Sequence, residues 1–189
     1  MSNRAFTFII LSSIPGLTHA RDGFEIGLGL GPAEGNFSID SASDEADVGA
    51  MFELQLGYVW ANGLGVGGGL SSTAFAYRVQ LLGQDVADLK LGFTTFDVNA
   101  LYFHPLSANW ELGLRAGISK TTSSFELGSL KSDKDSTGVQ AAIDAGYFVT
   151  DSFEVLVGLY YRTFGVAFKD VDENKELAAG GLELGVRWR

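Results

Sequence analysis

The sequence contains no cysteine, only three prolines and only two histidines among its 189 residues. Without cysteine the chain can form neither a disulfide framework nor a thiolate metal site. Basic residues are also scarce, and the net charge of −10 excludes the basic stripe of a nucleic-acid-binding protein. The hydrophobic content of 46% is too high for a disordered chain. The sequence therefore predicts one domain with a substantial core or a closed barrel.

Long apolar runs are absent too, apart from a short one at the N-terminus. Residues 1–20 combine a positive charge at Arg4, a mostly apolar stretch and a small residue at Ala20. This layout is typical of a secretory signal peptide cleaved after Ala20. The alternative, a buried helix, would be broken by Pro15-Gly16. No later stretch approaches the ~20 apolar residues of a membrane helix, so the single domain of residues 21–189 could cross a membrane only as strands.

Alternation with a period of two is the main pattern that the sequence does contain. Val139–Tyr147 and Phe153–Tyr161 each have apolar side chains at every second position, and Thr150-Asp151-Ser152 separates them. Successive side chains of a strand point to opposite faces, so this stretch predicts a hairpin with one apolar and one mixed face. Each arm has about the 9–11 residues with which a tilted strand crosses a bilayer.

The same alternation recurs along the chain and predicts eight strands, with no helical segment and no second domain. Three connections are short, and one of them contains the strong hairpin signal Asn62-Gly63. Four connections are long and polar, which predicts an up-and-down meander with two different ends; they are Pro32–Val48, the loop around Gly83, Lys120–Thr137 and Lys169–Glu176. Pro32 is expected to end the first strand. In the third strand the alternation reverses at residues 74–79, which a β-bulge would explain.

The charged residues decide which face meets lipid. On a soluble barrel the polar face would be the exterior, rich in lysine and glutamate, but here it carries mostly small residues and isolated charges. One arginine on the lipid face at the bilayer midplane costs roughly 2–4 kcal/mol. Many such charges could not be carried against a net stability of about 5–15 kcal/mol. The apolar face is therefore expected to meet lipid, and the predicted lumen charges are Glu25, Glu53, Asp97, Glu111, Arg115, Asp144, Glu154, Arg162, Glu183 and Arg187.

Aromatic residues support the same orientation, because they gather at both membrane interfaces of such barrels. The predicted aromatic girdle beside the short turns and the chain ends consists of Phe24, Tyr58, Trp60, Tyr102, Trp110, Tyr147, Phe153 and Trp188. A looser second group near the long connections would mark the opposite interface; its members are Phe75, Phe96, Tyr161, Phe164 and Phe168.

With these strands and the closing segment Gly181–Arg189, GLELGVRWR, the chain resembles the small outer-membrane barrels of the OmpA, OmpX and OmpW type. The resemblance covers Phe24 to Arg189. It implies an all-β fold, an eight-stranded antiparallel up-and-down transmembrane β-barrel. It also implies the outer membrane of a Gram-negative bacterium, with short turns in the periplasm and long loops outside. Outer-membrane lipid, lipopolysaccharide and the barrel-assembly machinery, which reads the C-terminal strand, are then the expected partners. Such barrels usually end in an aromatic residue, whereas here Arg189 follows Trp188.

Two functions are consistent with the predicted lumen. Arg187 is expected near Glu25 and Glu154, and Arg115 near Asp97 and Asp144. Guanidinium groups pair well with carboxylates, and unpaired charges in a narrow lumen are costly. Such a network would plug a monomeric barrel that acts through its extracellular loops, in adhesion, host interaction or envelope integrity. Because seven acids stand against three arginines, the alternative is a narrow cation-preferring pore or a small-molecule channel.

Catalysis is not expected. Lipid-modifying chemistry in a barrel needs a base such as histidine beside a nucleophilic serine. After signal cleavage only His104 remains, beside Pro105 in a short turn. The sequence therefore predicts a non-enzymatic protein without catalytic, cofactor-binding or metal-binding residues and without a nucleic-acid partner. Lys120 and Lys169 near the outer interface could contact lipid A phosphates.

Overall fold

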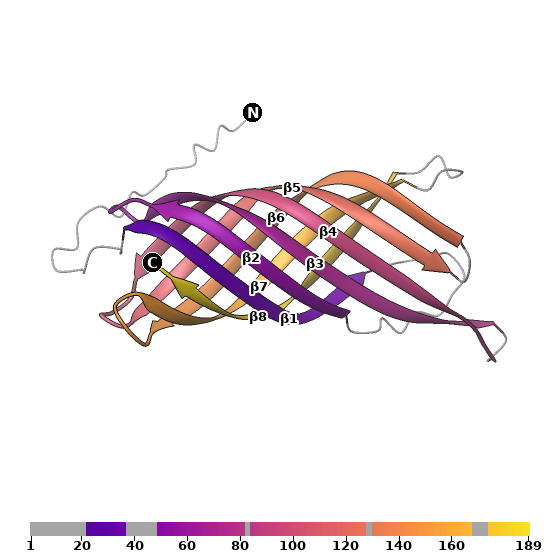
Figure 1. Cartoon of the computed structure of the whole chain (residues 1–189), viewed down its shortest axis with the longest axis horizontal. Helices are drawn as coiled ribbons and strands as arrows, with labels where there is room; N and C mark the ends of the chain where they lie inside the picture. The colour runs from indigo at the N-terminus through magenta and orange to yellow at the C-terminus, as the bar shows by residue number, and fades with distance from the viewer. Residues whose placement is uncertain (1–21, 37–48, 82–83, 128–129, 168–173) are drawn as a thin grey trace, which may run out of the picture.

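The computed structural model describes residues 22–36, 49–81, 84–127, 130–167 and 174–189. Eight antiparallel strands follow one another around a closed barrel, and β1 pairs with β8 to complete it (Figure 1). The strands are β1 (Gly23–Asn36), β2 (Gly49–Val59), β3 (Leu64–Leu81), β4 (Gln84–Pro105), β5 (Trp110–Leu127), β6 (Leu130–Phe148), β7 (Phe153–Ala167) and β8 (Asn174–Trp188). The predicted fold class is thereby confirmed. The expected signal peptide, residues 1–20, lies outside the described residues.

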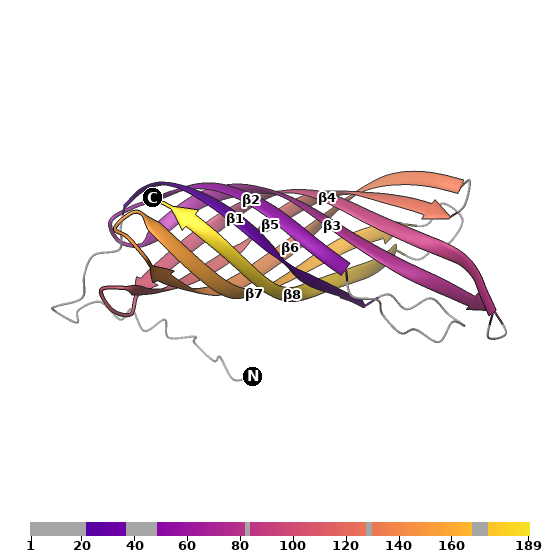
Figure 2. The same ribbon diagram turned by 60° about the horizontal axis from the view of Figure 1, so that its bottom comes forward.

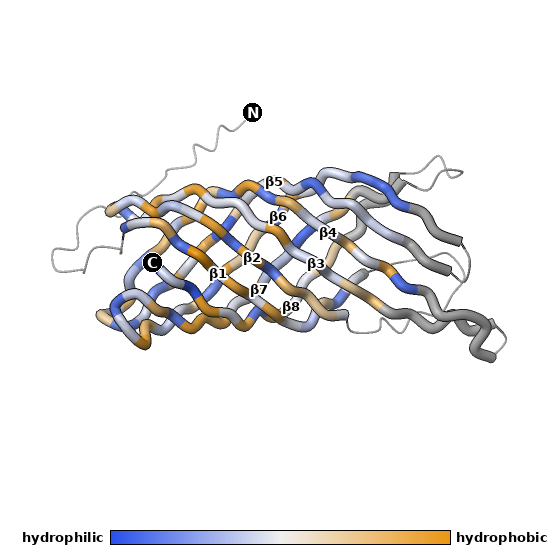
Figure 3. The backbone as a smooth tube through the Cα atoms, viewed as in Figure 1, coloured by the Kyte–Doolittle hydropathy of each residue, from blue (hydrophilic) through white to orange (hydrophobic). Residues whose placement is uncertain are grey.

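Side-chain exposure alternates along the strands as the sequence pattern predicts. In β1, Phe24 and Ile26 are 80% and 48% exposed, whereas Glu25 between them is 3% exposed. Figure 3 shows the apolar residues concentrated along the middle of the barrel and toward the end that carries the C-terminus, with hydrophilic stretches at the opposite end. No helix among the described residues is long and apolar enough to cross a membrane.

The three predicted short turns lie together at the end of the barrel where the C-terminus also lies (Figure 2). In the β2–β3 turn, Gly63 has a φ of 81°, a left-handed conformation that glycine adopts without steric cost. The side chain of Asn62 accepts a hydrogen bond from the Leu64 amide at 3.1 Å. This turn is the tight hairpin that the Asn-Gly pair predicts.

Two of the four predicted long connections are mostly strand. β3 and β4 pair as far as Leu81 and Gln84, and β5 and β6 pair as far as Leu127 and Leu130. These hairpins project beyond the rest of the barrel (Figure 1). Apolar and polar residues alternate in a sequence only where the two faces of a strand differ in polarity. Beyond the apolar part of the barrel this difference fades, although the backbone pairing of the two strands continues. The segments 37–48 and 168–173 of the other two connections lie outside the described residues.

The prediction that Pro32 ends the first strand is wrong. β1 continues to Asn36, and Pro32 is paired with Ala50 of β2. On the other side the ladder with β8 passes from Leu30 to Glu34 without a pair at Pro32. A proline, which has no N–H to donate, is tolerated in a strand where that side makes no ladder bond.

A β-bulge does not cause the reversal at residues 74–79, because β3 keeps one register with β4 from Leu64 to Val79. The register shift comes later, between Val79 and Gln80. Phe75 points inward and is 2% exposed. The apolar side chain therefore changes face while the strand remains regular.

The eight residues of the predicted aromatic girdle lie on outward-facing positions, and several form ring contacts across neighbouring strands. Phe24 meets Tyr58 with ring centroids 5.1 Å apart, and Trp110 meets Tyr147 at the same separation. In the second group, Phe96 and Tyr161 are 62% and 52% exposed. Its other members do not form an outer girdle: Phe75 and Phe164 are buried inside the barrel, and Phe168 lies outside the described residues.

Candidate functional site

All ten predicted lumen charges lie inside the barrel with exposures between 1% and 5%. Their carboxylates pack over glycines of neighbouring strands, which leave room that a Cβ would fill. Glu183 lies over Gly29 in this way, and Asp144 lies over Gly113. The inward glycines therefore fit acidic side chains into a narrow lumen, and this accounts for part of the high glycine content.

Arg115 of β5 crosses the lumen in its middle layer. Its Nη1 donates to Glu53 Oε1 at 2.8 Å, and its Nη2 donates to Glu183 Oε2 at 2.6 Å. The predicted neighbours were Asp97 and Asp144, which instead make ion pairs with other arginines. That prediction compared heights on adjacent strands, whereas a long guanidinium side chain reaches strands on the far side of the barrel.

Arg187 of β8 binds the lower layer of carboxylates, near the short turns. It contacts Asp144 at 3.0 Å and Glu154 at 3.1 Å, and it lies 3.9 Å from both Glu25 and Glu111. Glu154 is its direct cross-strand partner on β7. The structure thus brings Arg187 together with Glu25 and Glu154, the two partners that the sequence predicts.

Arg189 is a member of this layer that sequence reasoning missed. Its side chain is 2% exposed and contacts Glu25 at 3.0 Å and Glu111 at 2.7 Å. Its backbone N–H donates to Ser152 in the β6–β7 turn, and its guanidinium lies 3.9 Å from the centre of the Phe103 ring. The signal was present, because Arg189 continues the inward phase of Glu183 and Arg187.

A hydrogen-bonded layer surrounds Arg162 of β7, closer to the end of the barrel that carries the projecting hairpins. Gln140 Oε1 accepts from Arg162 Nε and Nη2 at 2.9 and 2.6 Å, and Gln140 Nε2 donates to Asn99 at 2.7 Å. Ser71 accepts from Arg162 Nη1, and Asp97 lies 3.6 Å away. The uncharged members of this layer were not predicted, although they share the inward phase of the charged ones.

An aromatic cluster lies inside the end of the barrel that carries the projecting hairpins; it consists of Ala33, Met51, Phe75, Phe93, Tyr160, Phe164 and Ala179. The rings of Phe93 and Phe164 stack with centroids 4.8 Å apart, and Phe75 meets Phe93 edge to face at 5.9 Å. Apolar side chains therefore fill this end of the lumen, and a second buried apolar cluster, Val59, Leu101 and Phe103, lies near the short turns beside the lower charges.

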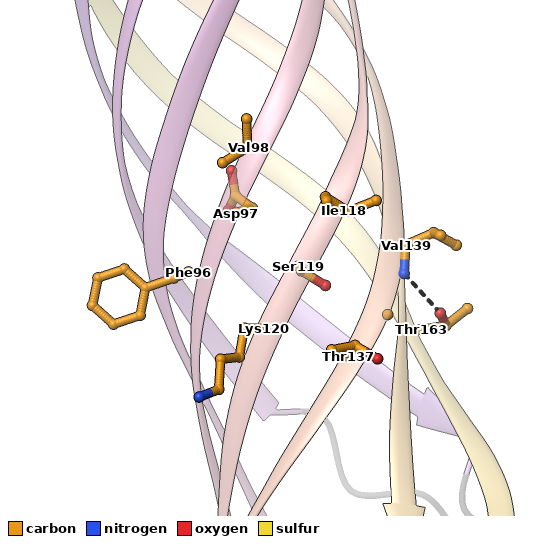
Figure 4. Close-up of a pocket in the computed structure, with 10 residues that line it drawn as sticks. Phe96, Asp97, Val98, Ile118, Ser119, Lys120, Thr137, Val139 and Thr163 are labelled. Carbon is orange, nitrogen blue, oxygen red and sulfur yellow. Dashed lines mark hydrogen bonds between the residues drawn. The ribbon is translucent and has the colours of Figure 1, made fainter.

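A hollow of about 750 Å³ lies beside the point where the β6–β7 ladder ends at the pair Gln140 and Arg162. Figure 4 draws the residues that line it. The outward-facing Phe96, Ile118 and Val139 line it together with the inward-facing Asp97 and Ser119. Phe96, Lys120 and Thr137 form one cross-strand row along it.

Asp135 stands beside this row, beyond the apolar belt and outside the membrane-spanning part. It lies 3.0 Å from Lys120 and accepts a hydrogen bond from Thr122 at 2.8 Å. The Thr122 hydroxyl, followed by the Lys120 ammonium, lowers the pKa of Asp135 below its ordinary value of 3.8. Both members of the ion pair are more than half exposed, so the pair is a surface contact and is expected to be weak.

His104 lies near the end of β4, where it pairs with Leu112, and not in the turn as predicted. Its ring lies 6.4 Å from that of Tyr102. In the described part of the chain no three His, Cys, Asp or Glu residues form a group that could hold a metal ion.

Comparison with known proteins identifies the family. The model of the outer membrane protein β-barrel domain matches residues 5–189. Among solved structures, Neisserial surface protein A has 22% identity, covers 87% of this chain and 96% of its own, and gives a TM-score of 0.64. OprG from Pseudomonas aeruginosa has 16% identity, covers 90% of this chain and 96% of its own, and gives a TM-score of 0.56. Ail, the attachment invasion locus protein of Yersinia pestis, in complex with the heparin analogue sucrose octasulfate, has 14% identity. It covers 87% of this chain and 97% of its own and gives a TM-score of 0.52.

At these identities the likeness to solved structures shows the fold alone, and no curated protein sequence matches the chain. The match of the family model, however, spans nearly the whole sequence. The chain therefore belongs to the outer-membrane β-barrel family and resides in the outer membrane of a Gram-negative bacterium, with its short turns in the periplasm.

Proposed function

We propose that this protein is a non-enzymatic barrel whose lumen is closed to ions and whose activity lies at its extracellular end. The observation that carries the proposal is the set of ion pairs across the lumen. Arg115 joins carboxylates of β2 and β8, and Arg189 joins carboxylates of β1 and β5. An arginine that binds carboxylates on two different strands is held in place across the lumen, because breaking either contact leaves a charge unpaired.

The space beside these pairs also supports a closed lumen. A cavity lined by Glu53, Arg115, Gln140 and Arg162 has a volume of about 10 Å³. That is room for about one water molecule and too little for a hydrated ion. Above it, the stacked rings of Phe93 and Phe164 occupy the lumen.

Planar-bilayer recording on the purified protein tests closure. We expect no steady current from the wild type. A steady cation-selective current would reject the closed lumen and support the alternative of a narrow cation pore or small-molecule channel. In that case Arg115→Gln should change the current while Lys120→Gln, on the outer surface, leaves it unchanged, which assigns the path to the lumen.

The extracellular end is the proposed working part, in adhesion, host interaction or envelope integrity. The β3–β4 and β5–β6 hairpins project there (Figure 1). Two of the similar structures are of proteins named for a surface location and for attachment and invasion. The Ail structure contains a heparin analogue, but the net charge of −10 disfavours a polyanionic ligand for this chain.

Trimming one hairpin tests this assignment. Replacing residues 123–134 with Asn-Gly keeps the pair Thr122 and Asp135 in register and supplies a two-residue hairpin turn. Bacteria that display the trimmed protein should adhere to epithelial-cell layers less than bacteria that display the wild type. A second variant trims the β3–β4 hairpin: it replaces residues 76–90 with Asn-Gly and keeps Phe75 opposite Leu91. Unchanged adherence with both hairpins trimmed, at equal surface amounts, would contradict an adhesive role and leave envelope integrity.

Lipid partners belong to the same proposal. We assign contact with a lipopolysaccharide phosphate to Lys120 at the hollow of Figure 4, with acyl chains along Phe96 and Ile118. Lys120→Gln should reduce the lipopolysaccharide retained in native mass spectra, whereas Lys90→Gln, six residues from Phe96 along β4, should not. Equal retention in both variants would contradict the assignment. The C-terminal strand is the proposed contact for the barrel-assembly machinery.

A further inference from the structure

The lumen carries more negative than positive side chains. Among the side chains that the structure describes, seven buried carboxylates face four buried guanidinium groups, which leaves three negative charges in excess. The upper layer is balanced, with Asp97 beside Arg162. The middle layer has two carboxylates for Arg115. The lower layer has four carboxylates for Arg187 and Arg189.

An excess of this size cannot persist as ionised carboxylates away from water. The desolvation of an unpaired buried carboxylate costs several kcal/mol, and the group takes up a proton instead. Proton uptake is the available response, because a proton needs no space of its own.

Two oxygens mark where the lower layer is incomplete. Glu154 and Asp144 each bind Arg187 through one oxygen. Their other oxygens, Glu154 Oε1 and Asp144 Oδ2, are buried and accept no hydrogen bond from the described residues. The side chains are 1% and 2% exposed, so bulk water does not solvate these oxygens. A protonated carboxyl is a hydrogen-bond donor, which an ionised carboxylate is not.

A metal cation fits the same place less well. Within the described ranges no group of three acidic or histidine residues could hold a metal ion. The cavity of about 10 Å³ beside the middle layer does not admit a hydrated cation.

We propose that the folded lumen is a proton-binding site that holds about three protons at neutral pH, two in the lower layer and one in the middle layer. The proposal rests on the closed lumen, since a water-filled pore would solvate the carboxylates. The charged groups that face one another in the lower layer are Glu25 of β1, Glu111 of β5, Asp144 of β6, Glu154 of β7, and Arg187 and Arg189 of β8.

Proton binding to the folded state alone fixes the direction of the pH dependence. In the unfolded chain these carboxyl groups are ionised above about pH 5. The folded barrel then holds more protons than the unfolded chain at pH 7, so its stability is greatest at the lower pH and falls as the pH rises.

Proton uptake during folding is the test. The protein is folded from urea into detergent micelles in weakly buffered solution at pH 7 with a pH indicator. We expect an uptake of about three protons per chain, as counted from the charge excess. Glu154→Gln should reduce the uptake by one proton, whereas Asp135→Asn, on the outer surface, should leave it unchanged.

The outcomes separate this proposal from the closed lumen. A barrel that carries no current and takes up no protons rejects the proton site alone. Stability that rises with added KCl at constant pH, without proton uptake, identifies a bound metal cation and overturns the proposal. A barrel that conducts rejects the closed lumen itself. The wild-type measurement decides even if Glu154→Gln fails to fold.

Discussion

The two ends of the lumen are built from opposite kinds of side chain. The lower and middle layers hold ion pairs of Arg115, Arg187 and Arg189, whereas the extracellular end holds the aromatic cluster around Phe93 and Phe164. The outer surface changes in the opposite direction: Leu28 and Leu184 face outward below, and Thr122 and Asp135 face outward above. The lumen is therefore richest in charge where the outer surface is most apolar, although Val59, Leu101 and Phe103 form a small buried apolar cluster near the short turns.

Removing Arg187 is expected to have the largest effect on stability. The change Arg187→Gln leaves Asp144 and Glu154 without their guanidinium partner in a buried layer in which carboxyl groups already outnumber guanidinium groups. Breaking a buried pair by removing one partner costs about 3–5 kcal/mol. Urea unfolding in micelles should show this loss at pH 7, and a smaller loss at pH 5, where the carboxyl groups take up protons. A loss below about 1 kcal/mol at pH 7 would contradict the role given to the ion pairs.

Removing an aromatic ring from the upper end should destabilise the barrel by a similar amount. Phe93→Ala deletes a ring that contacts both Phe75 and Phe164, and truncation of a buried phenylalanine costs about 3 kcal/mol or more. This loss should be the same at pH 5 and pH 7, because the cluster has no ionised member. Phe96→Ala is the matched control on β4, since that side chain is 62% exposed and faces outward. A loss at Phe93 that depends on pH would show that the two ends are coupled.

The sequence predicts the lower region well because there the alternation of apolar and polar residues coincides with the alternation of outward and inward faces. In β8, Leu182, Leu184 and Val186 alternate with Glu183 and Arg187, so both the strand and its orientation follow from the residues. In the upper region the relation is reversed, with apolar side chains on the inward face. Ser72 and Ala74 face outward, and Thr73 and Phe75 face inward, which in the sequence looks like a change of phase.

Partners across the lumen are harder to predict than faces. The inward phase places Arg115 in the lumen, but its contacts with Glu53 and Glu183 depend on the curvature that brings β5 opposite β2 and β8. Arg189 is hard to predict for a different reason: it follows Trp188, the aromatic residue with which such strands usually end, although position 189 is the next inward position after Arg187.

Adding a methyl group beside the tightly packed lumen charges should cause a loss of stability of intermediate size. A Cβ at Gly113 would collide with the Asp144 carboxylate, and overpacking of this kind typically costs about 1–3 kcal/mol. Gly113→Ala should therefore lower the urea midpoint. Gly27→Ala is the matched inward control, because its Cβ would meet its nearest atom, Gln55 Cβ, at 3.5 Å, an ordinary contact. Equal behaviour of the two variants would mean that the lower layer has room to rearrange.

The smallest expected effect has a pH dependence of opposite sign to that of the lumen. Because the Thr122 hydroxyl and Lys120 lower the pKa of Asp135, the stability that this group contributes is present above the unfolded pKa and is lost as the pH falls through the folded value. The effect should be confined to the β5–β6 hairpin, since Asp135 is exposed. Amide exchange of Thr122 and its neighbours should quicken relative to the barrel strands between pH 6 and pH 3 in the wild type, after correction for intrinsic rates. In Asp135→Asn this relative change should be absent. Acid would then loosen the projecting hairpin while the proton-binding lumen gains stability, so the two regions would be separable in one titration.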